Sequence, residues 1–217
     1  MKAGNTLLAS NVEVNMGDVI DLPFSMPLAM ALGGRASVRH FRPDVLTRGQ
    51  VRSLLQAAVR APTAMHQEPW SFVVVQDKAS LRRISEAAKP LFLRKLRDLH
   101  VDRDGRGEKM FSDPGFNIFY DANTLILVCG PRDAPFVAAD CWLAAGNIVL
   151  AAHAAGLGAC IIGSAVAALE DPDLRHELHI PPGQVVVAPI IVGVPAQAPT
   201  PSPRKEPRVL HWIHDAA

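Results

Sequence analysis

The sequence predicts a sandwich of the α/β or α+β class, built from short buried strands with helices between them. Four apolar runs rich in β-branched residues are typical of such strands: "FVVV", "NTLILVCG", "GACIIG" and "QVVVAPIIVGVP". Segments with helical periodicity separate these runs. Pro189 interrupts the fourth run, so we expect that strand to be bent or irregular there.

The clearest helix is predicted in "TRGQVRSLLQAAVRAP". Thr47 and Gln50 match a capping box, in which each side chain satisfies a free backbone N–H at the helix start. Apolar residues then follow at helical spacing, namely Val51, Leu54, Leu55 and Ala58. Pro62 disfavours helical geometry at Ala61 and ends the helix.

Further helices are predicted from apolar spacing and from end signals. They cover 26–32, closed by Gly33 and Gly34; 79–88, with Leu81 and Ile84 inward; 136–155, closed by Gly156; and a segment opened by Asp171 and Pro172. The charged stretch 89–113 is predicted to be either a mobile helical flap or a solvated face, and the pattern leaves both open.

The segment 136–155 is apolar on nearly every side, and a helix of that kind must be covered all round. Its length could suggest a membrane span, but Asp140, Asn147 and His153 interrupt it. We therefore expect a buried helix followed by a strand. Since a chain of 217 residues can hardly cover it alone, we also expect a subunit interface.

Composition sets limits on the class of protein. A hydrophobic content of 49% and a net charge of +1 favour a globular chain and give no sign of a nucleic-acid or membrane partner. Cys129, Cys141 and Cys160 stand among apolar neighbours, which indicates buried thiols in a reducing, cytoplasmic setting. We expect an N-terminal arm over 1–27 and a single domain over 28–217.

The motif "RASVR" is the first candidate for chemistry. Arg35, Ser37 and Arg39 are spaced by two, so an extended backbone points all three to one side. Two guanidinium groups and a hydroxyl suit a phosphate, although an exposed edge with solvated arginines has the same pattern. A second basic pair, Arg204 and Lys205, lies in a proline-rich tail that we expect to be extended.

Other kinds of site find little support. The glycine-rich nucleotide motifs are missing, no G-x-S-x-G surrounds a serine, and Cys160 has no predicted cationic neighbour that would favour a thiolate. His176 and His179 are expected on the surface rather than around a metal. With no catalytic side chain and no metal predicted, a cofactor would have to carry the chemistry.

Taken together, these segments resemble the FMN-dependent nitroreductase family over about 35–212. The resemblance rests on "RASVRHF", "APTAMHQEPWSFVVV", "AAGNIVLAAHAAGLGACIIG" and "VVVAPIIVGVPAQAPTPSPRK" in the family's order. It implies an α+β three-layer sandwich with a central mixed sheet, and an intertwined homodimer with FMN at the subunit interface. The residues it assigns to FMN are Arg35, Ala36, Ser37, Arg39, Pro62, Thr63, Ala64, Met65, His66, Ile162, Gly163, Arg204 and Lys205.

The resemblance also implies a role for each part of this set. Arg35 and Ser37 would hold the phosphate and ribityl end, and Arg39 would reach the pyrimidine edge of the flavin. Residues 62–66 would come from the other subunit. Ile162 and Gly163 would pass beneath the ring, with a backbone N–H near flavin N5.

Arg204 and Lys205 would close over the phosphate. This loop departs from the family's usual motif: Thr63-Ala64 replaces a pair of serines, His66 replaces the usual asparagine, and Glu68 replaces a glutamine. We expect His66 to keep a flavin hydrogen bond and Glu68 to pair with an arginine.

The implied activity is hydride transfer from NADH or NADPH, through flavin N5, to an electron-poor nitroaromatic or quinone, with ping-pong kinetics. Two alternatives stay open. One is another reaction of the same fold, such as dehalogenation, azoline oxidation or flavin fragmentation. The other is an FMN-binding or storage protein without turnover. The absence of tyrosine from 89–113 argues against recognition of phenols.

Overall fold

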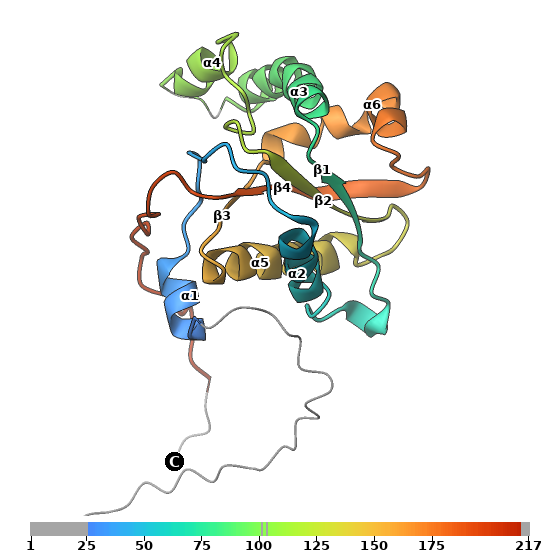
Figure 1. Cartoon of the computed structure of the whole chain (residues 1–217). Coiled ribbons are helices and arrows are strands. Elements are labelled where there is room, and N and C mark those ends of the chain that lie inside the picture. The colour runs from blue at the N-terminus through green and yellow to red at the C-terminus, as the bar shows by residue number, and fades with distance from the viewer. Residues whose placement is uncertain (1–25, 101, 103, 214–217) are drawn as a thin grey trace, which may run out of the picture.

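The computed structural model describes residues 26–100, 102 and 104–213, so the predicted arm over 1–27 lies almost wholly outside the described residues. The fold is α+β, with helices on both faces of one sheet (Figure 1). The strands are β1 Ser71–Val75, β2 Thr124–Pro131, β3 Gly158–Ile161 and β4 Gln184–Gly193. They lie side by side in the order β1-β2-β4-β3.

The helices form the two outer layers, with α2 and α5 on one face and α3, α4 and α6 on the other (Figure 1). Their bounds are α1 Leu28–Gly34, α2 Arg48–Ala58, α3 Lys78–Leu99, α4 Arg106–Phe111, α5 Val137–Ala154 and α6 Pro172–Glu177. Three short 3₁₀ turns complete the described residues: η2 Ala64–His66, η3 Gly163–Ala165 and η4 Ala168–Glu170.

The predicted mixed character of the sheet needs a correction. All neighbouring strands among β1–β4 pair antiparallel. The parallel component is confined to an isolated bridge between Ser37 and Ala159, because the segment that follows α1 runs along β3 for only a short distance. The three-layer arrangement itself is confirmed.

Strand β2 shows why the sheet is buried on both faces. Leu125, Leu127 and Cys129 enter the core beneath α3, whereas Ile126 and Val128 enter the core beneath α2 and α5. Successive side chains of a strand point to opposite faces, so both sets must be apolar. This explains why the sequence of β2 is mainly apolar and does not alternate between apolar and polar residues.

The irregularity predicted at Pro189 lies slightly earlier in the strand. The register of β2 with β4 shifts between Val128, which pairs with Ala188, and Cys129, which pairs with Val186. Val187 is therefore the extra residue of a bulge. Pro189 stays within the ladder opposite Leu127, and its carbonyl accepts a hydrogen bond of 2.8 Å from the Ile162 N–H.

The helix predictions are confirmed in type, and one is wrong in length. The capping box of α2 forms, with the Thr47 hydroxyl accepting from the Gln50 N–H at 3.2 Å. Helix α3 runs to Leu99 instead of ending near 88, with Pro90 inside it. The buried ammonium of Lys89 donates to the carbonyls of Asp113 and Pro114 and ties the middle of α3 to the chain before β2.

Helix α5 packs against the sheet and α2 through eight buried residues, among them Cys141, Ile148 and Ala152. Of the described helices, it alone is long and apolar enough to cross a membrane, and it packs as a core helix does. Trp142 and Leu143 nevertheless remain about half exposed, at 46% and 48%. The described residues leave one side of this helix partly uncovered, as the sequence predicts.

The segment after α1 docks on the free edge of β3. The Val38 N–H donates to the Ala159 carbonyl at 3.0 Å, and the Val38 side chain is buried. A Cβ added to Gly158 would lie 2.7 Å from the Cβ of Val38. Glycine is therefore needed at 158 so that the segment can approach the strand.

We predict that Gly158→Ala lowers the melting temperature, since overpacking at such a contact costs about 1–3 kcal/mol. The matched control is Gly33→Ala, because a Cβ there meets nothing within 4 Å. The control is expected to be neutral or slightly stabilising, as alanine favours a helix. Equal melting temperatures for the two variants would contradict this account of the docking.

Candidate functional site

Two adjoining cavities mark the candidate site, and Arg39 lines both. The larger, about 500 Å³, lies between the α3–α4 pair and the end of β3. The smaller, about 280 Å³, lies between the segment 36–40 and the segment 197–200. Three parts of the chain that are distant in sequence therefore meet here: the "RASVR" motif, the turn after β3 and the start of the C-terminal tail.

The "RASVR" motif has the alternation that the sequence predicts. Val38 is buried against β3, while Ser37 and Arg39 on either side of it are exposed. Arg35 is half-buried, with an extended backbone at φ −62° and ψ 127°. The tail holds the motif from its other side, because the Ala196 N–H donates to the His40 carbonyl at 2.9 Å. The motif is thus fixed between β3 and the tail.

The turn after β3 presents an open backbone to the larger cavity. Ile162 and Gly163 both line it, and a Cβ added to Gly163 would meet nothing within 4 Å. No hydrogen bond from the Gly163 N–H is found among the described residues. A free N–H beside an open glycine allows a flat ligand to approach the backbone closely and to accept a hydrogen bond.

Aromatic side chains form the opposite wall of the larger cavity. Phe92 of α3 packs on Phe111 of α4 with ring centroids 4.5 Å apart, and Phe116 continues the row to Tyr120. The Arg39 guanidinium lies 5.9 Å from the centroid of the Tyr120 ring. Burial raises the pKa of Tyr120, and the nearby Arg39 partly offsets this.

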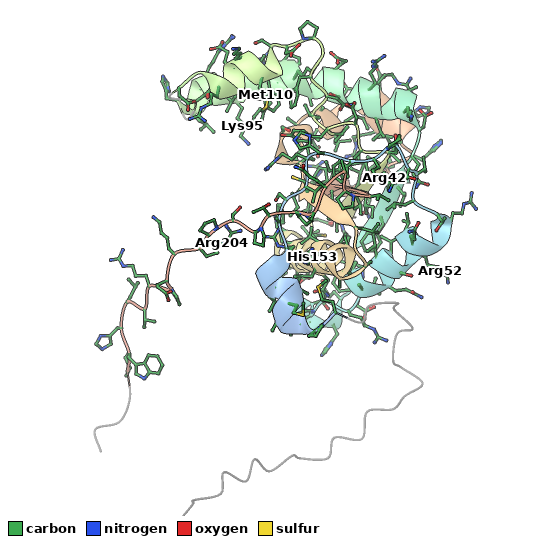
Figure 2. The ribbon with its side chains drawn as sticks, turned by 60° about the vertical axis from the view of Figure 1, so that its left-hand side comes forward. Arg42, Arg52, Lys95, Met110, His153 and Arg204 are labelled. Atoms are coloured by element: carbon green, nitrogen blue, oxygen red, sulfur yellow. The ribbon has the colours of Figure 1, made fainter. Side chains whose placement is uncertain are left out.

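Sequence reasoning missed most of this wall. The predicted flap over 89–113 supplies Phe92, Lys95, Met110 and Phe111 to the cavity. Figure 2 shows Lys95 and Met110 near one another on the underside of the two helices. The solvated-face alternative is therefore wrong for the inner side of this segment. Tyr120, the single tyrosine of the chain, follows the flap and was not predicted.

The three cysteines are buried and free, as the sequence predicts. Burial raises the pKa of Cys129 to about 12 and that of Cys141 to about 11. Cys160 lines the larger cavity and, contrary to the prediction, has a cationic neighbour in Arg39. Burial is the largest effect and raises the pKa of Cys160, with Arg39 and Ser37 acting in the opposite direction.

Residues 62–66 lie far from "RASVR" in this chain. They form the loop between α2 and β1, at the N-terminal end of α5, where the Ala64 N–H donates to the buried carboxylate of Asp140 at 3.0 Å. Figure 1 shows this loop at the opposite end of α5 from the start of β3. The structure thus does not bring Pro62, Thr63, Ala64, Met65 and His66 together with Arg35 and Ser37.

The loop has an unusual backbone. Met65, His66 and Glu68 have φ values of 55°, 54° and 45°, in the left-handed region that favours glycine. Met65 is 75% exposed. Such strain is maintained only where the surroundings impose it and is concentrated at binding sites. The prediction that Glu68 pairs with an arginine is not met among the described residues, where Glu68 is exposed and has no ion pair.

Arg204 and Lys205 stand apart from the cavities. Figure 2 shows the C-terminal segment leading away from the body of the protein, with Arg204 along it. Arg204 is exposed, and its guanidinium donates only to the neighbouring Pro203 carbonyl among the described residues, at 3.3 Å. The structure confirms an extended tail but does not place these two cations over the smaller cavity.

Metal binding gains no support from the described part of the chain. No group of three or more histidine, cysteine, aspartate or glutamate side chains there could hold a metal ion. His176 and His179 are both exposed, as the sequence predicts.

A family model matches most of this architecture. The model of the nitroreductase family covers residues 32–194, which include the "RASVR" motif, the loop at 62–66, the aromatic wall and the turn after β3. The chain belongs to the nitroreductase family. The resemblance inferred from the sequence is thereby confirmed.

Relatives and solved structures agree with the family assignment. A protein of Methanothermobacter thermautotrophicus named "Putative NADH dehydrogenase/NAD(P)H nitroreductase" is 28% identical over 86% of each chain. An iodotyrosine deiodinase of Thermotoga neapolitana is 29% identical over 57% of this chain and 67% of its own. A nitroreductase of Bacteroides fragilis, solved with bound FMN, has the same fold with a TM-score of 0.71, 22% identity and coverage of 88% of this chain and 100% of its own.

We predict that none of the three thiols of this nitroreductase-family protein reacts rapidly with an aryl disulfide reagent at pH 8. The thiolate is the reactive form, and burial holds all three groups in the thiol form. A pH of 10 is still below the pKa values of about 12 for Cys129 and about 11 for Cys141, so both thiols remain mainly protonated. In denaturant all three should react; a fast native-state reaction would show a reactive cysteine.

Proposed function

We propose that this protein is an FMN-dependent oxidoreductase, in which NADH or NADPH donates hydride and an electron-poor nitroaromatic or quinone accepts it in a ping-pong cycle. One observation carries the proposal. The Ser37–Arg39 segment, the open Gly163 turn and an aromatic wall enclose adjoining cavities whose common residue is a cation. Similar proteins carry FMN in their solved structures, including one from Desulfitobacterium hafniense.

The residues present fit FMN. A phosphate suits Arg35 and the Ser37 hydroxyl, because guanidinium and hydroxyl groups donate charge-assisted hydrogen bonds to phosphate oxygens. The Gly163 turn suits a flat ring, since its Cβ direction is open and its N–H is free. When bound, FMN supplies the atom N5, which takes up hydride from one substrate and gives it to the next.

The side chains of this protein would bind and orient rather than exchange protons. Arg39 at the pyrimidine edge would stabilise the negative charge of reduced flavin, because a fixed cation in a partly dry site lowers the energy of a developing anion. Ile162 and Gly163 would support the ring from below. The phenyl rings of Phe92, Phe111 and Phe116 would exclude water from the acceptor space.

We further propose that the site is completed by a second copy of the chain. Helix α5 has 18 residues, and 1.5 Å per residue makes it about 27 Å long. Ala64 is bonded to its first turn, whereas Ser37 bridges to Ala159 just beyond its last turn. Residues 62–66 would therefore serve the flavin of the partner subunit, with Arg204 and Lys205 closing over the phosphate once the tail is held in the dimer.

The partly exposed apolar side chains of α5 support this proposal. Trp142 and Leu143 are about half exposed, and Leu28 and Met30 of α1 are 69% and 62% exposed. Burial of apolar surface at about 25 cal/mol per Å² drives subunit association. A homodimer with two sites at its interface would cover these residues and assemble both halves of each site.

The first test is the state of the flavin. The purified protein, supplied with FMN and freed of excess ligand, should retain the cofactor. Anaerobic addition of NADH or NADPH should then bleach the absorption of oxidised flavin, and a nitroaromatic or quinone should restore it. A protein that does not retain FMN refutes the proposal. Bound FMN that neither donor bleaches would instead indicate the storage alternative.

A panel of acceptors tests the rival reaction. Because iodotyrosine deiodinases are among the relatives, a halogenated phenol is the specific alternative substrate. A further solved relative contains both FMN and 3-iodo-L-tyrosine. We expect turnover with nitroaromatics and quinones to exceed turnover with iodophenols. Faster turnover of iodophenols than of nitroaromatics and quinones would instead support a dehalogenating activity.

Arg35→Ala is predicted to weaken FMN binding about ten- to a hundredfold, because a charge-assisted hydrogen bond to the phosphate contributes roughly 1.5–3 kcal/mol. The matched control is Arg42→Ala, since Arg42 lies in the same segment but forms an ion pair with Asp44 at 3.0 Å. Flavin fluorescence titration measures both dissociation constants. Unchanged affinity in Arg35→Ala would refute the phosphate assignment.

A further inference from the structure

The charge of the larger cavity points to a class of acceptor. Among its thirteen lining residues are two cations, Arg39 and Lys95, and no aspartate or glutamate. Hydroxyl groups of Tyr120 and Ser164 also line it, and the other lining residues are apolar, glycine or thiol-bearing. A cavity with aromatic walls and an excess of positive charge favours a ligand that is flat and anionic.

Lys95 differs from two other cations of its helix, Lys89 and Arg97, in having no acidic partner in the described part of the chain. Lys89 donates to Glu86 at 3.0 Å, and Arg97 donates to Glu108 at 2.6 Å. No ion pair or hydrogen bond of Lys95 is found among the described residues. Lys95 therefore lines the cavity without a counter-ion among the described residues, whereas Glu86 and Glu108 pair with Lys89 and Arg97 on the same helix.

The two cavity cations come from different parts of the fold. Arg39 belongs to "RASVR", lies beside Tyr120 and lines both cavities, so the proposed function assigns it to the cofactor. Lys95 extends from α3, from the aromatic wall that faces the Gly163 turn. A molecule placed between the turn and the wall would meet Lys95 at its outer edge, next to Met110.

We infer that the preferred acceptor is an electron-poor aromatic carboxylate, and that Lys95 determines this specificity by binding the carboxylate. The inference rests on the proposed function. For a nitrobenzoate, the net reaction would take one hydride from NAD(P)H and one proton from the solvent, convert the nitro group to a nitroso group and release one water molecule. NAD(P)H becomes NAD(P)⁺, and the carboxylate is unchanged.

A binding test needs no turnover. Calorimetric titration of the FMN-loaded protein compares benzoate with benzamide, which have the same ring but differ in charge. Benzoate should bind more tightly to the natural protein, and Lys95→Met should reduce this preference about tenfold, as for one partly solvated charge-assisted contact. Lys95→Glu should make benzamide the tighter ligand. High salt should also weaken the preference, because the contact is partly exposed.

Arg94→Met is the matched control, since Arg94 precedes Lys95 on α3, carries the same charge and does not line the cavity. It should leave the benzoate preference unchanged. If both variants lost the benzoate preference equally, the preference would come from the overall positive charge of the helix, and the assignment of Lys95 would be overturned. Equal binding of benzoate and benzamide to the natural protein would overturn it as well.

A kinetic test shows whether Lys95 affects the reaction with the acceptor or the reaction with the donor. The ratio of kcat/KM for 4-nitrobenzoate to that for 4-nitrobenzamide should fall about tenfold in Lys95→Met, while reduction of the flavin by NADH and NADPH stays unchanged. A loss confined to NADPH would assign Lys95 to the donor and refute the inference. If 4-nitrobenzamide is reduced but the ratio does not change, only this inference fails. If neither donor reduces the flavin, the proposed function fails first.

Discussion

Helix α5 is the constraint on which the rest of the structure depends. Its buried face fixes α2 and three strands of the sheet, and its first turn holds the loop after α2 through Asp140. Its last turn leads directly into β3, the strand on which "RASVR" docks. Because it is about 27 Å long, it keeps the two sets of residues that we propose to bind FMN at opposite ends of one chain. Trp142 and Leu143 of the same helix remain about half exposed, so the proposed division of the site and the proposed dimer would have a common cause.

The site on one chain depends on close approaches at the free edge of β3. Gly158 admits Val38, the bridge from Ser37 to Ala159 sets the register, and the bonds of 40–42 to 194–196 close the other side. These contacts orient Ser37 and Arg39 outward beside the Gly163 turn. The α3–α4 pair then lies opposite, held in part by the buried Lys89. Rigid positioning of this kind suits a cofactor that carries its own chemistry, since the protein has to bind and orient it without supplying an acid or a base.

The sequence was sufficient to predict those features that interactions between nearby residues determine. The capping box of Thr47 and Gln50, the buried strands and the alternation of "RASVR" all follow from short-range rules. The bulge at Val187 could not be predicted, because it arises from matching β4 to β2 across the sheet. Phe92, Lys95 and Tyr120 were missed as site residues because no motif marks them and only the path of α3 brings them to β3. The contact between Arg39 and Cys160 is likewise a tertiary one that no spacing reveals.

The most direct test of a site shared between two chains is subunit complementation. Two inactive variants are prepared, one carrying Arg35→Ala with Ser37→Ala and the other carrying a disrupted 62–66 loop, and they are unfolded together and refolded as a mixture. If each site takes residues from both chains, half of the randomly formed dimers are mixed, and one site in each of these is intact, so about a quarter of the natural activity returns. If each site is built from a single chain, no mixed dimer contains an intact site, and the mixture stays as inactive as its components. Recovery of about a quarter of the activity would establish the shared site, and an inactive mixture would contradict it.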